Sequence, residues 1–189
     1  MKHICVYAAS SDAAGEHYKE AARRLGGLIA ERGCTLVYGA GNVGLMGECA
    51  RAVHAGGGRV VGVIPDRLAD LELAYREADE LIVTETMRDR KAIMAERADA
   101  FVALPGSIGT LEEMIEVLVL KQLGYHRKPC VFLNVDGFYD HLFAFLGRLV
   151  EERFFKESSL DMFGVCMTPA AVFEYLDGYV PAPPPHKWF

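Results

Sequence analysis

AFVALPGSIGTLEE, residues 100–113, is the stretch that decides the fold class of this 189-residue chain. Its beginning, Ala100–Leu104, is the short apolar run of a strand buried on both faces. A glycine-containing turn follows, and apolar positions then recur with helical spacing from Leu111 to Leu123. The stretch therefore predicts a strand, a tight turn and a helix in direct succession, which is the repeating unit of α/β proteins.

The same alternation recurs on both sides of this unit. The expected strands are His3–Tyr7, Thr35–Tyr38, Val60–Ile64, Glu80–Thr84, Ala100–Leu104, Cys130–Asn134 and Gly164–Met167. The expected helices are Gly15–Arg32, Gly44–Ala55, Arg88–Arg97, Leu111–Leu123, Tyr139–Arg153 and Ala170–Leu176. Strands that alternate with helices indicate a parallel sheet covered by helices on both faces.

Size and composition limit the class of protein. We expect one domain at residues 1–180 and a Pro-rich tail at 181–189. The formal net charge of −6 argues against a nucleic-acid partner, and no apolar run approaches the roughly 20 residues of a membrane-spanning helix. The five cysteines are odd in number and lack Cys-x-x-Cys spacing. They favour buried thiols of a cytoplasmic protein over a disulfide framework or a zinc site.

The turn within residues 104–113 combines glycines with a carboxylate. Gly106 and Gly109 leave backbone N–H groups free to bind a phosphate. Thr110 and Glu113 also have capping-box spacing, with Thr110 as the N-cap of the helix. In that alternative the buried helix stripe consists of Leu111, Met114, Ile115 and Leu118. The local pattern favours a cap, whereas a carboxylate beside an anion site favours catalysis, so both interpretations stay open.

A second glycine-rich loop, Gly39–Gly47, follows a strand and begins a helix. Gly39, Gly41 and Gly44 match the G-x-G-x-x-G pattern of dinucleotide-binding turns. In dinucleotide-binding folds this pattern follows the first strand, and a later acidic residue binds the ribose. Here the loop follows the second expected strand, and the acidic candidate, Asp66, lies beyond a proline. We expect a phosphate or sugar contact here, not a nicotinamide cofactor; the alternative is a tight turn with close helix–sheet packing.

The segment Thr86–Met94 places positive charges where a helix begins. Arg88, Arg90 and Lys91 lie near its start, where each cation opposes the helix macrodipole by about 0.3–1 kcal/mol. This violation of a local rule favours a functional site over a solvated basic face. Ligands of parallel sheets bind beyond the carboxyl ends of the strands, which is where all three loops lie.

These loops resemble those of the LONELY GUY family, which are cytokinin riboside 5′-monophosphate phosphoribohydrolases. Residues 105–113 are similar to that family's P-G-G-x-G-T-x-x-E motif, and Met87–Met94 to its arginine–lysine pair between two methionines. Gly39–Gly47 is similar to its glycine loop ending G-L-M-G, and the resemblance runs from Cys5 to about Val180. It implies a Rossmann-like, doubly wound α/β fold, a homodimer, and neither cofactor nor metal.

The resemblance also assigns residues. The family's catalytic residues fall on Arg90 and Glu113. The expected substrate contacts are Ser10, Gly39, Gly41, Gly44, Glu72, Met87, Arg88, Lys91, Gly106, Ser107, Ile108, Gly109, Thr110, Leu111 and Glu112. This chain departs from the family pattern at Ala9, Ala40, Arg88, Ser107 and Val119.

The resemblance implies a hydrolase that cleaves the N-glycosidic bond of a purine nucleoside 5′-monophosphate, with N6-modified adenosine as the nucleoside, to free base and ribose 5-phosphate. Glu113 would stabilise an oxocarbenium-like transition state and orient a water. Arg90 would neutralise charge on the leaving purine, although its pKa makes it a poor proton donor.

Three other functions are alternatives to this hydrolase. The main alternative is a non-catalytic nucleotide-binding protein with Glu113 only as a cap. A pyridoxal-phosphate lysine decarboxylase needs a Schiff-base lysine with an aspartate partner, and the sequence shows no such pairing. A dehydrogenase is disfavoured by the weak dinucleotide pattern. The choice between AMP and N6-prenylated AMP stays open.

Overall fold

The computed structural model describes residues 1–69 and 74–181, and in them seven strands form one parallel sheet. The strands are β1 (His3–Tyr7), β2 (Thr35–Tyr38), β3 (Arg59–Pro65), β4 (Glu80–Thr84), β5 (Ala100–Ala103), β6 (Cys130–Leu133) and β7 (Gly164–Cys166). Their spatial order is β4-β3-β2-β1-β5-β6-β7. The order reverses between β1 and β5, so the fold is doubly wound and Rossmann-like, as expected.

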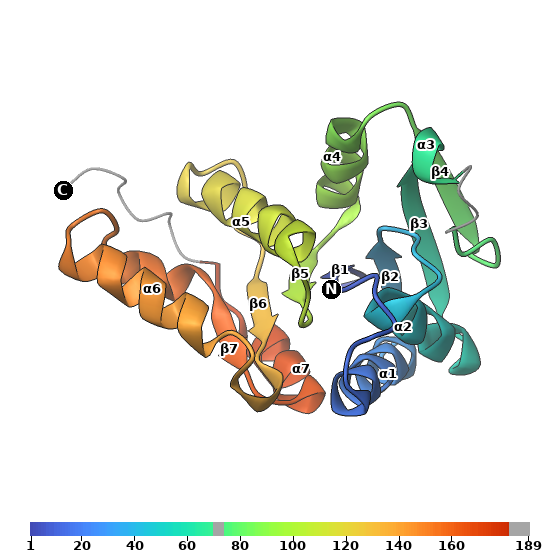
Figure 1. Cartoon of the computed structure of the whole chain (residues 1–189), viewed down its shortest axis with the longest axis horizontal. Helices are drawn as coiled ribbons and strands as arrows, with labels where there is room; N and C mark the ends of the chain where they lie inside the picture. Colours follow the sequence, from blue (N-terminus) through green and yellow to red (C-terminus); the bar gives the residue numbers. More distant parts are fainter. Residues whose placement is uncertain (70–73, 182–189) are drawn as a thin grey trace.

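Helices cover both faces of the sheet (Figure 1). They are α1 (Glu16–Glu31), α2 (Gly44–Ala55), α3 (Asp66–Ala69), α4 (Met87–Arg97), α5 (Ile108–Gln122), α6 (Asp140–Glu151) and α7 (Pro169–Gly178). Two short 3-10 helices are η1 (Val135–Gly137) and η2 (Glu157–Met162). Helices α1, α2 and α7 pack on one core cluster, and α4, α5 and α6 pack on the other.

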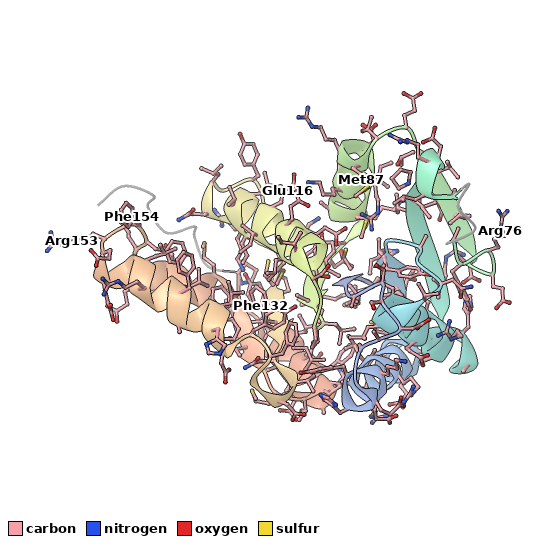
Figure 2. The ribbon with its side chains drawn as sticks, in the orientation of Figure 1. Arg76, Met87, Glu116, Phe132, Arg153 and Phe154 are labelled. Atoms are coloured by element: carbon pink, nitrogen blue, oxygen red, sulfur yellow. The ribbon has the colours of Figure 1, made fainter. Side chains whose placement is uncertain are left out.

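Side-chain alternation along the strands builds these two cores. On β1, Ile4 and Val6 face the α1–α2–α7 side, while Cys5 and Tyr7 face the opposite side. Phe132 of β6 lies in the second core, labelled in Figure 2, with its ring edge-on to those of Tyr139, Phe143 and Phe163. Because both faces are buried, the strands read as continuous apolar runs.

The expected strands and long helices are confirmed, with ends shifted by a few residues. The sequence did not predict α3, since four residues are too few to show a helical period. Ile115, expected in the buried stripe of α5, is exposed, and Val117 is buried instead. The boundary between the domain and the tail stays a prediction, because residues 182–189 lie outside the described part of the chain.

The five cysteines are all buried and unpaired. None of the helices in residues 1–69 and 74–181 has the length and apolar character needed to cross a bilayer.

Candidate active site

A cavity of about 300 Å³ opens where the strands end. Its walls come from the segments that follow β1, β2 and β3, and from the first turns of α4 and α5. Elements distant in sequence therefore converge at the carboxyl edge of the sheet, the usual ligand position in this class of fold.

A buried ion pair lies in the cavity wall. Arg90, from the first turn of α4, donates from Nη1 to Oε1 of Glu113 on α5 at 2.8 Å. Its Nε donates to the Val63 carbonyl oxygen at the end of β3, at 3.1 Å. The two charged side chains are 9% and 10% exposed. The guanidinium is thus fixed by two other elements, β3 and α5.

Burial changes the proton affinity of Glu113. Loss of hydration raises the pKa of this carboxyl above its ordinary value, while the Arg90 charge and hydrogen bond oppose the rise. A carboxyl with a raised pKa is suited to accept and return a proton near neutral pH.

The N-terminus of α5 is open to an anion. The helix begins at Ile108, and its N-cap, Ser107, makes no side-chain capping hydrogen bond. The N–H groups of the first turn therefore remain available, and the helix dipole favours negative charge there. A Cβ on Gly106 would lie 2.1 Å from the Thr110 hydroxyl oxygen, so only glycine lets Thr110 fold back over the turn.

The capping-box alternative is wrong. Because α5 begins at Ile108, Thr110 lies inside the helix and is buried, and cannot be its N-cap. Glu113 correspondingly lies in the second turn, where its carboxylate bonds to Arg90. The capping function therefore does not explain Glu113.

The glycine loop between β2 and α2 shapes the opposite wall. A Cβ on Gly39 would lie 1.8 Å from Nη2 of Arg90, so a side chain there would displace the guanidinium. Gly44 has a φ of 63° and approaches residues 9–11 closely, which makes its contribution one of packing. Ala40 has a φ of 58°, a left-handed conformation that costs a non-glycine residue roughly 1–2 kcal/mol.

Lys91 joins α4 to α5 instead of lining the cavity. Its Nζ pairs with Glu112, and with Glu116 Oε2 at 2.8 Å. Both carboxylates raise the pKa of Lys91. Figure 2 labels Met87 on α4 and Glu116 on α5, the two helices joined by these ion pairs.

The structure brings most of the expected site residues together. Those that line the cavity are Ser10, Gly39, Gly41, Met87, Arg90, Ser107, Gly109, Thr110, Glu112 and Glu113. Those that are described but do not line it are Gly44, Arg88, Lys91, Gly106, Ile108 and Leu111. Glu72 lies outside the described residues.

The sequence patterns missed an apolar part of the wall. Its members are Ala8, Val43, Met46, Ile64 and Leu68. These apolar residues belong to no recognisable motif. Their positions just after β1, in the glycine loop and at or after the end of β3 could have predicted them as cavity residues, because ligands bind beyond the carboxyl ends of parallel strands.

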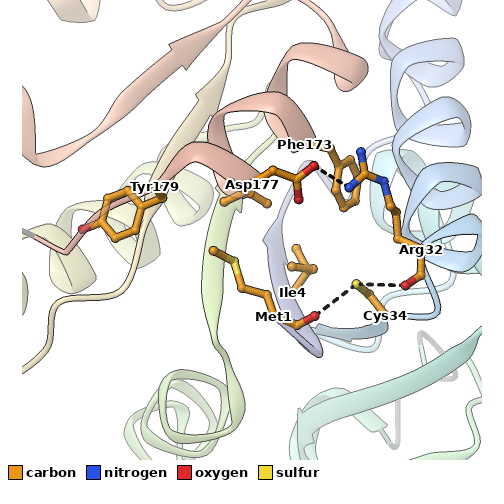
Figure 3. Close-up of a pocket in the computed structure, with 8 residues that line it drawn as sticks. Met1, Ile4, Arg32, Cys34, Phe173, Asp177 and Tyr179 are labelled. Carbon is orange, nitrogen blue, oxygen red and sulfur yellow. Dashed lines mark hydrogen bonds and ion pairs between the residues drawn. The ribbon is translucent and has the colours of Figure 1, made fainter.

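A second cavity, of about 440 Å³, lies at the opposite edge of the sheet (Figure 3). It is lined by the start of β1, the end of α1 and helix α7, with Arg32 and Asp177 paired at 2.6 Å. It is remote from the Arg90–Glu113 pair. No cluster of three or more His, Cys, Asp or Glu side chains able to hold a metal was found in the described part of the chain.

The fold and the cavity define a Rossmann-like α/β protein with a buried arginine–glutamate pair beside an open helix N-terminus. A family model described as "Possible lysine decarboxylase" matches residues 46–176. The chain is 45% identical over 186 residues to the probable cytokinin riboside 5′-monophosphate phosphoribohydrolase LOGL5 of Oryza sativa subsp. japonica, covering 98% of this chain and 75% of that one. It is 43% identical over 181 residues to cytokinin riboside 5′-monophosphate phosphoribohydrolase LOG2 of Arabidopsis thaliana, covering 96% and 85%. The protein belongs to this family of phosphoribohydrolases.

Solved structures share the fold. The molybdenum cofactor binding protein of the phototrophic bacterium Rippkaea orientalis has a TM-score of 0.72 and 25% identity, covering 94% of this chain and 96% of that one. The molybdenum cofactor carrier protein of Chlamydomonas reinhardtii has a TM-score of 0.71 and 24% identity, covering 94% and 99%. The same fold therefore occurs in proteins that are named for binding or carrying the molybdenum cofactor.

Proposed function

We propose that this protein hydrolyses the N-glycosidic bond of N6-modified adenosine 5′-monophosphates, releasing the free base and ribose 5-phosphate. The observation that carries the proposal is the buried Arg90–Glu113 pair on the wall of a cavity that also contains the open start of α5. The curated relatives are named for this activity on cytokinin riboside 5′-monophosphates.

The geometry supports different roles for the start of α5, which would bind the phosphate, and for Glu113, which would act at the sugar. The 5′-phosphate binds the backbone N–H groups of Ile108, Gly109 and Thr110 at the start of the helix. Glu113 follows about one and a half turns later and faces the sugar. Anchoring the phosphate supplies binding energy that positions the anomeric carbon beside the carboxylate.

The chemical step needs only water. The water oxygen forms a bond to the anomeric carbon while the bond from that carbon to the purine nitrogen breaks. Glu113 orients the water, accepts its proton and stabilises the positive charge of the sugar. The purine leaves with the bonding electron pair and gains a proton from solvent. Arg90 offers N–H groups to the developing negative charge, since its own proton is held too tightly to transfer.

The apolar wall supports an N6-substituted purine. Val43, Met46, Ile64, Leu68 and Met87 line the cavity from elements other than α5. Apolar side chains of this kind gain free energy by covering a purine ring and an apolar tail. We therefore propose N6-prenylated AMP as the preferred substrate over AMP.

Incubation with substrate pairs tests the proposal. The purified protein is mixed with AMP, N6-prenylated AMP and the two matching nucleosides, and free base and ribose 5-phosphate are separated by chromatography. We expect cleavage of the monophosphates, with kcat/KM for the nucleosides lower by about 100-fold or more because the phosphate anchor is missing. Failure to release base from any monophosphate would refute the proposed activity.

Two alternative functions remain to be compared with the proposed hydrolase. Solved neighbours of this fold are named as cofactor-binding and carrier proteins, which favours a non-catalytic nucleotide-binding protein as the second candidate. Tight nucleotide binding without base release would identify that function. A pyridoxal-phosphate lysine decarboxylase does not fit, because no described lysine lines the cavity to form the Schiff base.

We also propose that the protein is a cytoplasmic homodimer. Helix α5 exposes Ile115 and Val119, and its C-cap Leu123 is also exposed, which gives an apolar stripe that a second copy would cover. Buried, unpaired thiols suit a reducing compartment. Light scattering at micromolar concentration should give twice the chain mass, and Val119→Arg should lower it. A monomer mass for the unmodified protein would contradict the dimer.

A further inference from the structure

The connection from β3 to β4 differs from the other crossovers of the sheet. Parallel strands are usually joined through a helix that packs along the sheet. Here the described part of the connection, residues 66–69 and 74–79, contains only α3, which has four residues and none buried. We call these residues the crossover segment. Its position depends on a few specific bonds, because it lacks a long helix with an apolar face.

The crossover segment forms part of the cavity wall. Leu68 lines the cavity, and Ala74 forms an antiparallel bridge with Gly41, which also lines it. The Tyr75 N–H donates to the carbonyl oxygen of Ala40 at 2.8 Å. Ala40 has its backbone in the left-handed region and no polar side chain to hold it there. Tyr75 and Ala74 therefore hold the first part of the glycine loop, whereas the Gly44 N–H, which donates to Asp12, holds its end.

Two side chains and one backbone amide anchor the hydroxyl of Tyr75. Its hydroxyl lies 2.8 Å from Nδ1 of His54, at the end of α2. The other nitrogen of His54, Nε2, lies 3.0 Å from Oδ2 of Asp79. Asp79 also accepts the N–H of Val60, on β3, at 2.7 Å. The chain of bonds thus ties the crossover segment to both α2 and β3.

Charge and burial set the direction of these hydrogen bonds. The Val60 N–H and His54 lower the pKa of Asp79, so this group is a carboxylate and Nε2 of His54 donates to it. Burial, and then the nearby Glu77, raise the pKa of Tyr75, which stays a neutral phenol. The Tyr75 side chain is buried, whereas its neighbour Arg76 points outward (Figure 2).

We propose that His54, Tyr75 and Asp79 are positioning residues for the substrate cavity. They hold residues 74–75 against the glycine loop, and so fix the wall that carries Gly41 and Leu68. None of the three lines the cavity, so they act through that wall and not on the substrate. The inference rests on the proposed function only where its test measures hydrolysis.

The position of the cluster predicts which kinetic constant changes. Arg90 bonds directly to Glu113 and to the Val63 carbonyl oxygen, and neither bond involves a residue of the crossover segment. Loosening the wall should therefore weaken substrate binding more than the chemical step. Tyr75→Phe removes one hydroxyl and keeps the ring, and His54→Leu removes both bonds of the imidazole.

Kinetics and hydrogen exchange test the proposal together. We expect both variants to raise KM for the monophosphate by about five- to tenfold, the scale of one lost hydrogen bond, with kcat within about twofold. Exchange of the Tyr75 amide, which donates to Ala40, should accelerate by a similar factor. His141→Leu, at an exposed histidine of α6, is the matched control and should change neither quantity.

The outcomes separate this inference from the proposed function. Exchange needs no substrate, so it tests the anchoring even if the unmodified protein releases no base. Unchanged exchange at Tyr75 in both variants would overturn the inference. So would a fall in kcat with constant KM, because the cluster would then act on the chemistry or on the fold as a whole.

Discussion

Replacing Glu113 with glutamine tests whether the buried carboxylate performs chemistry. Glutamine has the same shape, and its amide oxygen can still accept the 2.8 Å hydrogen bond from Arg90 Nη1. It cannot accept a proton from water or offset positive charge on the sugar. We expect turnover to fall by about 100-fold or more, the contribution typical of an acid–base group.

The structure also predicts how the free energy of unfolding of Glu113→Gln, relative to the wild-type protein, changes with pH. Burial raises the pKa of Glu113 above the ordinary 4.5, despite the neighbouring Arg90. A carboxyl that binds its proton more tightly in the folded state stabilises the protein most below its unfolded pKa, and this stability is lost as pH rises through the folded pKa. A tenfold difference in proton affinity between the folded and unfolded states corresponds to about 1.4 kcal/mol. Glu113→Gln cannot ionise, so its free energy of unfolding relative to wild type should increase as pH rises above 4.5.

The assay measures turnover and urea unfolding on the same sample from about pH 4, near the ordinary pKa of a glutamate, to about pH 8. Glu116→Gln is the control, since Glu116 is exposed on the same helix and pairs with Lys91 away from the cavity. It should keep normal turnover. Near-normal turnover of Glu113→Gln would refute the catalytic assignment. A loss of stability that grows with pH would refute the burial argument.

Three further substitutions probe the other parts of the site. Arg90→Lys should lower turnover by about 100-fold and reduce the free energy of unfolding by about 1–3 kcal/mol, because the Val63 carbonyl loses its donor; kinetics and urea unfolding measure both. Gly39→Ala should lower the free energy of unfolding by about 1–3 kcal/mol and remove most of the activity, because the new methyl group meets Arg90. The control is Gly27→Ala on α1, where no atom lies within 4 Å of the new methyl group; thermal unfolding should show it to be more stable by about 0.5–1 kcal/mol. Leu68→Ser should reduce kcat/KM about fivefold for N6-prenylated AMP and less for AMP, and equal losses would place the prenyl tail elsewhere.

The sheet was predictable because its strands are buried on both faces. Runs such as residues 100–104 and 130–133 are apolar throughout, and their short length and the turn residues that follow them indicate strands. The crossover segment was not predictable by the same means. Its α3 has no periodic apolar face, and its position depends on single contacts between distant residues, such as Tyr75 with Ala40.

The site was predictable where backbone conformation dictates residue type. Gly39 and Gly106 are required because a Cβ at either would collide with Arg90 or Thr110. The contact between Arg90 and Glu113 could not be read from local spacing, because it joins two helices, and a local interpretation favoured a helix cap instead. Family resemblance supplied both residues, and the structure adds that they are paired and buried.

The departures from the family pattern have unequal physical consequences. Ser107 replaces a usual glycine, but its φ of −88° is open to any residue, and its side chain leaves the helix N–H groups uncapped. An anion at the start of α5 would bind backbone groups, so this substitution preserves the proposed phosphate site. Ala40 is different, since its φ of 58° lies where glycine is favoured. The bond from Tyr75 to Ala40 offsets that strain, which makes the glycine loop of this chain depend on the crossover segment more than a loop with glycine at this position would.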